Sequence, residues 1–253
     1  MSEVAVPDSD PKGDEAMNLF DHLQELRVRL FKCLAAFSVL SIAGWFLYER
    51  ILDLLVSPLK KLPEAEKLVS QGKLIFTSPP EALFIRLKIT AFAGFIMALP
   101  VILWQVWRFV TPGLYRREKR YAIPFVFTSM LLFAMGTILA FISLPQTLRF
   151  LVALAGTEFV LVPRASEYLS FILLLVVAFG ATFEFPLVLV FLALAGVITS
   201  RTLRKGRRTA WVAVLLAAAI VTPTQDPFTM LALAVPLGLL YELTILTIRA
   251  LKR

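Results

Sequence analysis

The sequence LSFILLLVVAFGATFEFPLVLVFLALAGVI, residues 169–198, is an apolar run long enough to cross a lipid bilayer. A hydrocarbon core of about 30 Å needs roughly 20 helical residues. Glu184 lies near the middle of this run, with no Lys or Arg close to it in the sequence. A charge at that depth costs about 2.5 to 3.5 kcal/mol on insertion scales. We therefore expect Glu184 either to be neutral and hydrogen-bonded, fixing helix packing alone, or to serve a function.

Similar runs recur along the chain and predict an all-α, polytopic membrane protein. Of its 253 residues, 58% are hydrophobic and 17% are charged, and the mean hydropathy is +0.79, which is too apolar for a soluble domain. Besides 169–198, the expected membrane-spanning segments are 30–48, 89–107, 122–144, 210–221 and 228–248. We expect residues 18–253 to form one domain of six transmembrane helices, preceded by a disordered acidic tail at 1–17.

Basic residues predict the orientation of these helices. Lys and Arg are most frequent before the first segment, in the second and fourth connections and at the C-terminus, which places these parts in the cytosol. Both RTLRKGRRT at 201–209 and RALKR at 249–253 belong to this set, so an even number of crossings must separate them. The segment 210–221 is therefore a span although twelve residues rise only about 18 Å.

The last two helices are expected to be short and to be joined by the outside turn TPTQDP at 222–227. Asp226 should cap the sixth helix, with Pro227 at its first position. For the fifth helix, 210–221, two predictions are equally good: it is shorter than the bilayer, or the flanking Thr209 and Thr222 lengthen it. Pro58 is expected to shape the outside connection 49–88. Several aromatic residues fall near segment ends and are expected to be interface anchors: Trp45, Tyr48, Trp104, Trp107, Tyr121 and Trp211.

The sequence gives no support for catalysis, metal binding or nucleic-acid binding. It contains no phosphate-binding loop and no zinc-binding motif. A single histidine, His22, is a weak metal signal, and the lone Cys33 excludes an internal disulfide framework. The net charge of +8 is concentrated beside the apolar runs, as membrane topology signals are. We expect no enzyme activity and no cofactor.

Several stretches together resemble the TatC family, the multispanning core of the twin-arginine protein translocase. They are HLQELRVRL at 22–30, SPLKKLP at 57–63, TSPPEAL at 77–83, ALPVILWQVWRFVTPGLYRREKR at 98–120, FGATFEFP at 179–186 and TPTQDPF at 222–228. The resemblance implies a cupped six-helix bundle in the cytoplasmic membrane. It also implies a receptor for the Arg-Arg signal peptides of folded export substrates, whose export is driven by the proton-motive force.

The resemblance also assigns roles to particular residues. In the family, acidic residues at the inner surface bind the signal arginines, and these correspond to Glu25 and Glu118 here. A carboxylate pairs with a guanidinium through two charge-assisted hydrogen bonds, which an ammonium cannot reproduce. On residues alone, Glu25 with His22 reads as a solvated pair, and Glu118 as a local salt-bridge partner. The other residues expected at this site are His22, Phe109, Pro112, Tyr115 and Arg120.

For Glu184, the resemblance implies a contact with a polar residue in the transmembrane helix of a TatA-like protein. A second docking edge, for a TatB-like protein, is expected on the last two helices and includes Trp211 and Met230. Many relatives have Gln where this chain has Met230, which removes a hydrogen-bonding side chain from that edge. An oligomeric receptor complex is expected. The alternative is a proton-coupled secondary transporter of a small solute in which Glu184 binds the coupling ion.

Overall fold

The computed structural model describes residues 19–60, 74–110, 122–155, 164–222 and 226–251. Its described helices are α1 (Leu19–Phe46), α2 (Tyr48–Lys60), α4 (Pro79–Val110), α5 (Ala122–Ala155), α6 (Ala165–Phe183), α7 (Phe185–Leu194), α8 (Ser200–Lys205), α9 (Arg207–Val221) and α10 (Pro227–Leu251). Across those ranges, extended pairing is limited to one bridge between Ile75 and Arg164. The expected all-α class is confirmed, whereas the tail 1–17 lies outside the described residues.

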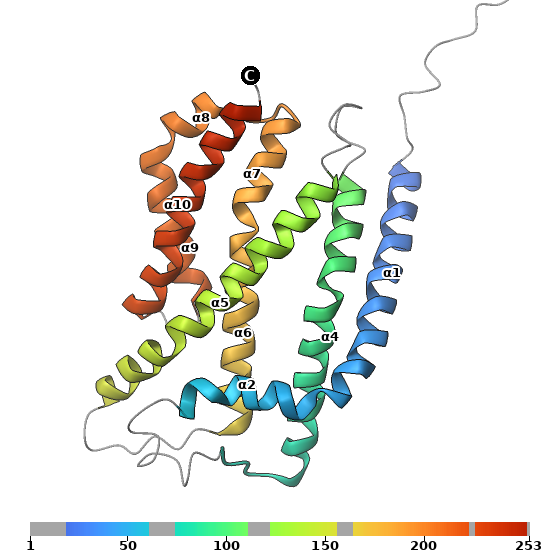
Figure 1. Ribbon diagram of the computed structural model, residues 1–253, viewed down its shortest axis with the longest axis vertical. Coiled ribbons are helices and arrows are strands. Elements are labelled where there is room, and N and C mark those ends of the chain that lie inside the picture. The colour runs from blue at the N-terminus through green and yellow to red at the C-terminus, as the bar shows by residue number, and fades with distance from the viewer. Residues whose placement is uncertain (1–18, 61–73, 111–121, 156–163, 223–225, 252–253) are drawn as a thin grey trace, which may run out of the picture.

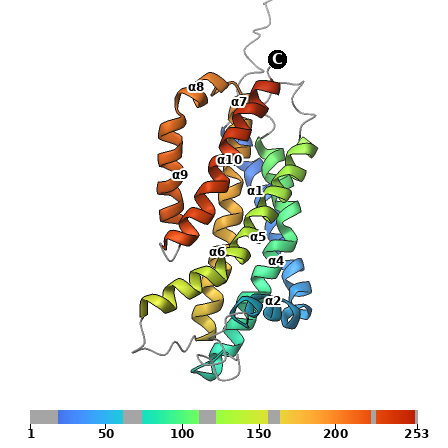
Figure 2. The same ribbon diagram turned by 60° about the vertical axis from the view of Figure 1, so that its left-hand side comes forward.

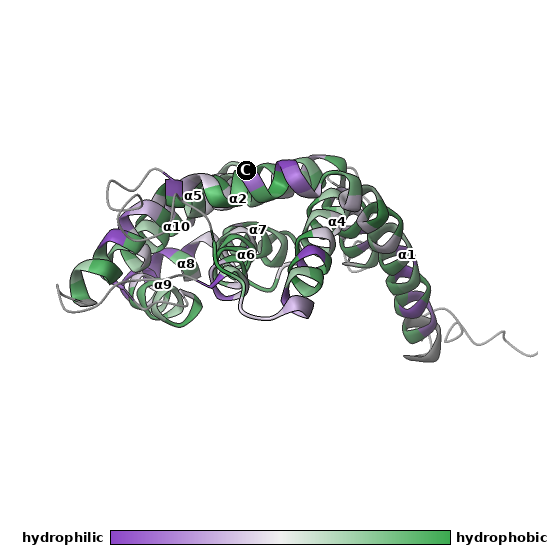
Figure 3. Cartoon of the chain, turned by 90° about the horizontal axis from the view of Figure 1, so that it is seen from below, coloured by the Kyte–Doolittle hydropathy of each residue, from purple (hydrophilic) through white to green (hydrophobic). Residues whose placement is uncertain are grey.

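The helices form a curved array with two free ends. Helix α1 packs mainly against α4, α4 against α5, and α5 against α6, while α10 contacts α5, α7 and α9. Seen from below, α1 stands at one side of the array and α9, α10 and the far end of α5 lie towards the other, as expected for a cupped bundle (Figure 3). Helices α8, α9 and α10 form a hairpin-like unit beside α7 (Figure 2). In Figure 1, α8 and the start of α1 lie at one end, here called the α8 end, and α2 lies at the other, the α2 end.

Four spans are long and apolar enough to cross a bilayer within the described part of the chain: Pro79–Phe109, Ile123–Leu154, Ala165–Leu194 and Pro227–Ala250. Residues Leu23–Phe46 qualify together with α2, to which they are bent by 79°. Helix α9 has 15 residues, or about 22 Å, so the expected short fifth helix is confirmed. The expectation of a short sixth helix is wrong, because α10 has 25 residues. It starts at the Asp226 cap and continues past the apolar run to Leu251.

Helix α2 occupies a region that the sequence analysis treated as a connection. It runs across the α2 end of the bundle (Figure 1) and buries one face formed by Leu55, Val56, Pro58 and Leu59. Pro58 therefore lies inside a helix rather than in a loop. Its ring removes a helical hydrogen bond, and the hydroxyl of Ser57 donates instead to the carbonyl oxygen of Leu54 at 2.8 Å.

Close packing of α1 on α4 depends on small residues. A Cβ atom on Gly94 would lie 2.6 Å from the Cα atom of Ser41, closer than real side chains allow. One on Gly44 would lie 2.9 Å from the Cβ atom of Ala93. Small residues let helix backbones approach closely in membranes. Helix α1 thus attaches to the array mainly through this seam with α4, while side chains such as Leu30 and Phe46 remain exposed.

Trp107 corrects one expectation about interface anchors. Its side chain is only 9% exposed and belongs to the main apolar core. It stacks on Phe125 with ring centroids 4.5 Å apart and meets Phe191 edge-on at 5.7 Å. Its position near the end of a segment is typical of interface anchors. Here, however, three helices converge and bury the side chain. Trp107 joins α4, α5 and α7 at the α8 end.

Candidate functional sites at two depths

Glu25 lies on α1 near the α8 end and is held by a guanidinium from its own helix. Arg29 lies one turn further along α1, the spacing at which helical side chains meet. Its Nε atom donates to Glu25 Oε1 at 3.0 Å, and Nη2 makes a second, shorter contact with the same oxygen. Arg29 Nη1 also reaches Gln105 Oε1 of α4 at 3.4 Å. The ion pair is half-buried, with the side chains of Arg29 and Glu25 14% and 29% exposed.

A small polar pocket of about 240 Å³ surrounds this pair. It is lined by Gln24, Glu25, Val28, Arg29, Lys32 and Arg108. Three of these described side chains are cations and one is an anion, so the described lining carries net positive charge. Gln105 was not identified from the sequence, although it is the only amide in the apolar run 89–107, which was a usable signal.

The other residues expected at this site are described only in part. Phe109 lies half-buried in the last turn of α4, next to the pocket residue Arg108. His22 belongs to α1, but its side chain is outside the described part of the structure. The same holds for the whole of the loop 111–121, which contains Glu118, Pro112, Tyr115 and Arg120. The structure therefore brings together Glu25, Arg29, Gln105 and Arg108, and the role of Glu118 stays a prediction.

Glu184 lies at a break between α6 and α7, in the middle of a span. Pro186 explains the break, because it cannot donate the helical hydrogen bond to the carbonyl of Thr182. The helix resumes with Leu187 and Val188, whose N–H groups donate to Glu184 O at 3.0 and 3.1 Å. The break places a carboxylate at the point where α6 ends and α7 begins.

The carboxylate of Glu184 has one partner on another helix. Ser129 of α5 donates its hydroxyl to Glu184 Oε2 at 2.5 Å. Within the described ranges, the other oxygen, Oε1, is buried and accepts no hydrogen bond. A buried acceptor without a donor costs about 1 to 3 kcal/mol. The site therefore contains an unsatisfied polar atom at the depth of the membrane interior.

Beside this break lies an apolar pocket of about 600 Å³ between α6, α7, α9 and α10. Its lining includes Thr182, Phe185, Ala213 and Tyr241. Trp211, expected to contact a partner, is partly exposed and packs on its own chain at Gly238, where an added Cβ atom would lie 2.2 Å from its ring. Met230, expected beside it at the docking edge, is half-buried against the core, and its N–H donates to Asp226 O at 3.1 Å.

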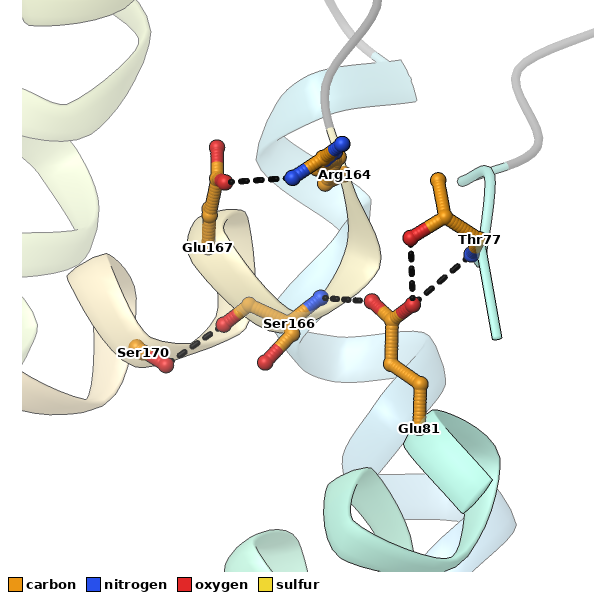
Figure 4. Close-up of polar contacts among 6 residues, drawn as sticks. All are labelled: Thr77, Glu81, Arg164, Ser166, Glu167 and Ser170. Carbon is orange, nitrogen blue, oxygen red and sulfur yellow. Dashed lines mark hydrogen bonds and ion pairs between the residues drawn. The ribbon is translucent and has the colours of Figure 1, made fainter. Parts of the chain in front are cut away.

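Two further acidic residues accept hydrogen bonds at the starts of helices. Asp226 caps α10 as expected, accepting from the Thr229 N–H at 2.9 Å, and its side chain is buried. Glu81 was not singled out from the sequence. It accepts from the N–H and hydroxyl of Thr77 at 2.7 and 3.1 Å and from the N–H of Ser166 at 3.3 Å (Figure 4). Glu81 therefore fastens the start of α4 to the start of α6.

Among the residues that the structure describes, no three His, Cys, Asp or Glu side chains gather as metal ligands. A sequence model described as Sec-independent protein translocase protein (TatC) matches residues 21–236. The chain belongs to the TatC family. This assignment agrees with the arrangement of spans around Glu25 and Glu184.

TatC proteins from several bacteria are similar to this chain over most of its length. It is 44% identical to the Sec-independent protein translocase protein TatC of Aquifex aeolicus, over 90% of this chain and 93% of that protein. It is 39% identical to the Frankia casuarinae protein of the same name, over 92% of this chain but only 66% of that longer protein. A crystal structure of the twin arginine translocase receptor TatC matches with a TM-score of 0.72 and 42% identity, covering 92% of this chain and all of that one.

Proposed function

We propose that this protein is the signal-peptide receptor of a twin-arginine protein translocase. The resemblance to solved TatC receptors supports this function, and the observation that carries it is the contact at Glu25. That carboxylate already accepts two guanidinium nitrogen atoms from Arg29, which is the interaction that an arginine of a signal peptide requires. A signal arginine would bind Glu25 in the same manner, and Glu118 is proposed to bind the second arginine of the pair.

The proposal places the protein in the cytoplasmic membrane with the α8 end and both termini in the cytosol. The clusters of Lys and Arg on α8 and at the start of α9 support this orientation. A signal peptide of an unexported protein would then meet Glu25 before any part of the cargo crosses the membrane. Export of the folded cargo would be driven by the proton-motive force and would need further Tat subunits.

Glu184 is proposed to serve a later step, the docking of a TatA-like transmembrane helix. Its Oε1 oxygen accepts no hydrogen bond within the described ranges, and this supports the role, because a polar side chain on an incoming helix could donate to it. The adjoining apolar pocket offers α9 and α10 as an edge for a TatB-like helix. An oligomeric receptor complex follows from docking at two separate edges. The single-domain organisation of residues 18–253 is part of the same proposal.

The structure gives less support to a proton-coupled transporter. That function needs ionisable groups that converge near the membrane midplane. Glu184 is hydrogen-bonded to Ser129, whereas Glu242, an acid within the predicted span 228–248, pairs with Arg207 at 2.7 Å near the α8 end. In the described helices, no second acid approaches Glu184 by hydrogen bond or ion pair.

Peptide binding tests the receptor function directly. The purified protein should bind a synthetic Arg-Arg signal peptide more tightly than its Lys-Lys counterpart. Glu25→Gln should weaken Arg-Arg binding by about 1.5 kcal/mol or more, roughly tenfold, because one charge-assisted hydrogen-bonded pair is lost. Glu167→Gln is the matched control, since Glu167 is exposed at the α2 end. Equal binding of the two peptides, unaffected by Glu25→Gln, would refute the receptor proposal.

A further inference from the structure

The carboxylate that should receive a signal arginine is already bound by an arginine of the same chain. Arg29 contacts Oε1 of Glu25 through two of its nitrogen atoms, Nε and Nη2. The bond to Gln105 anchors the same guanidinium to α4. With 14% of its side chain exposed, Arg29 is held between two helices rather than extended into solvent. The Glu25–Arg29 pair therefore contains the same two groups, a carboxylate and a guanidinium, as the contact proposed between Glu25 and a signal arginine.

Charge makes this occupancy consequential. The pocket around Glu25 also contains Lys32 and Arg108, so among its described lining residues one carboxylate faces three cations. An arginine added to this pocket without any rearrangement would meet net positive charge, which opposes binding. If the incoming guanidinium replaces that of Arg29, the number of cations bound to Glu25 does not change. Exchange is thus electrostatically easier than addition.

We propose that Arg29 is an internal competitor that occupies the signal-arginine site until a signal peptide displaces it. This inference rests on the proposed receptor function. Glu25 is then available only in the fraction of molecules whose Arg29 has moved away, and the apparent affinity for a signal falls by that fraction. Displaced Arg29 retains Gln105 as a hydrogen-bond acceptor. Arg29 thereby lowers the apparent affinity for signal peptides, so that only a peptide that binds Glu25 tightly enough displaces it.

A purely structural ion pair predicts the opposite result for the same substitution. Neighbouring charges four residues apart commonly stabilise a helix. If Arg29 only held Glu25 in place, its removal would disorder the carboxylate and weaken peptide binding. If Arg29 competes with the peptide, its removal strengthens binding. The sign of the change separates the two roles.

The experiment uses the full-length protein in nanodiscs and a synthetic Arg-Arg signal peptide. Arg29→Gln should bind the peptide roughly two- to tenfold more tightly, the range expected for release of a helical charge pair. The gain should be in the association rate, because only the open fraction changes. Arg29→Lys, which keeps the charge but loses the planar fork, should show a smaller gain in the same direction. It also provides a result if Arg29→Gln fails to fold.

Two comparisons isolate competition at Glu25. In a Glu25→Gln background, the gain from Arg29→Gln should disappear, since the contested carboxylate is absent. Lys32→Gln removes one positive charge from the same pocket and reports the effect of charge alone. Its gain in peptide affinity should be smaller than that of Arg29→Gln. Weaker binding by Arg29→Gln, an equal gain with Lys32→Gln, or a gain that persists without Glu25 would each overturn the inference.

Failure of this inference is distinguishable from failure of the receptor proposal. If Glu25→Gln weakens binding and Arg29→Gln does not strengthen it, Glu25 binds the signal but Arg29 is no competitor, and the inference alone is overturned. If the Arg-Arg and Lys-Lys peptides bind equally and Glu25→Gln has no effect, the receptor proposal fails and the inference fails with it.

Discussion

At the scale of single residues, Glu25 and Glu184 are carboxylates placed in opposite electrostatic surroundings. Glu25 faces three cations near the α8 end and is held by a guanidinium. Glu184 has only the Ser129 hydroxyl and one buried oxygen without a donor in the described part of the chain. A carboxylate surrounded by cations can exchange one bound cation for another. A buried carboxylate with an unsatisfied acceptor oxygen can instead accept a hydrogen bond from a neighbouring helix.

Glu184→Gln tests this difference. The amide can still accept from Ser129, so the fold should be retained, and binding of an Arg-Arg peptide at the distant α8 end should not change. Crosslinking to a TatA-like helix from a photoreactive probe at the exposed residue Phe185 should fall. Hydrogen bonds between membrane helices average about 0.6 kcal/mol, so the decrease should be roughly threefold.

Glu167→Gln serves as the control, because it makes the same substitution at an exposed residue away from the break between α6 and α7. Unchanged crosslinking in Glu184→Gln would show that this carboxylate does not contact the partner. Reduced peptide binding would instead show that the two sites are not independent.

At the scale of helices, sequence rules succeeded where the signal was local. The cap at Asp226 follows from Asp, Pro and Thr within four residues, and the structure contains it. Helix α2 was missed because Pro58 and several charges suggested a connection. Its apolar residues Ile51, Leu55 and Leu59 nevertheless recur at helical spacing. The bond between Ser129 and Glu184 joins residues 55 positions apart, and one sequence contains no local signal for it.

Asp226→Ala should destabilise the last hairpin. The change removes a side-chain acceptor from the Thr229 N–H and leaves that buried group without this bond. Loss of such a cap costs about 0.5 to 2 kcal/mol, so the midpoint of thermal unfolding in detergent should fall. Asp53→Ala, on the exposed face of α2, removes only a surface pair with Lys60 and should change stability by less than about 0.5 kcal/mol. Equal melting of the two variants would contradict a capping role.

Gly94→Ala should loosen the seam between α1 and α4. The new methyl group would overlap Ser41, so the helices must separate, at a cost of about 1 to 3 kcal/mol. We expect a lower unfolding midpoint and faster proteolysis of α1. Gly206→Ala is the matched control, because a Cβ atom there has 3.5 Å to its nearest neighbour. If Gly94→Ala melts like Gly206→Ala, the seam does not hold α1 in the array.

At the scale of the whole molecule, charge counting and parity predicted that the basic residues at 201–209 and the C-terminal part of the last helix lie at one end of the molecule. The start of α9 and the last turns of α10 lie at the same end, joined by the pair of Arg207 with Glu242 and by the bond from the Tyr241 hydroxyl to Leu203 O at 2.8 Å. This common end is what an even number of crossings requires, although α9, with 15 residues, is not among the four described helices that are long and apolar enough to span a bilayer alone. The surroundings of Glu25 were not predictable in the same way, because Gln105 reaches Arg29 across 76 positions.

Orientation of the whole molecule is the condition on which the receptor proposal depends, and cysteine labelling tests it. In a Cys33→Ser background, which removes the chain's only cysteine, Asp53→Cys on α2 and Arg204→Cys on α8 place single thiols on exposed residues at opposite ends. A membrane-impermeant maleimide should label the α2 thiol in intact cells and the α8 thiol only after permeabilisation. The Cys33→Ser protein itself should remain unlabelled. Labelling of the α8 thiol from outside would place Glu25 away from the cytosol, where no unexported signal peptide could reach it.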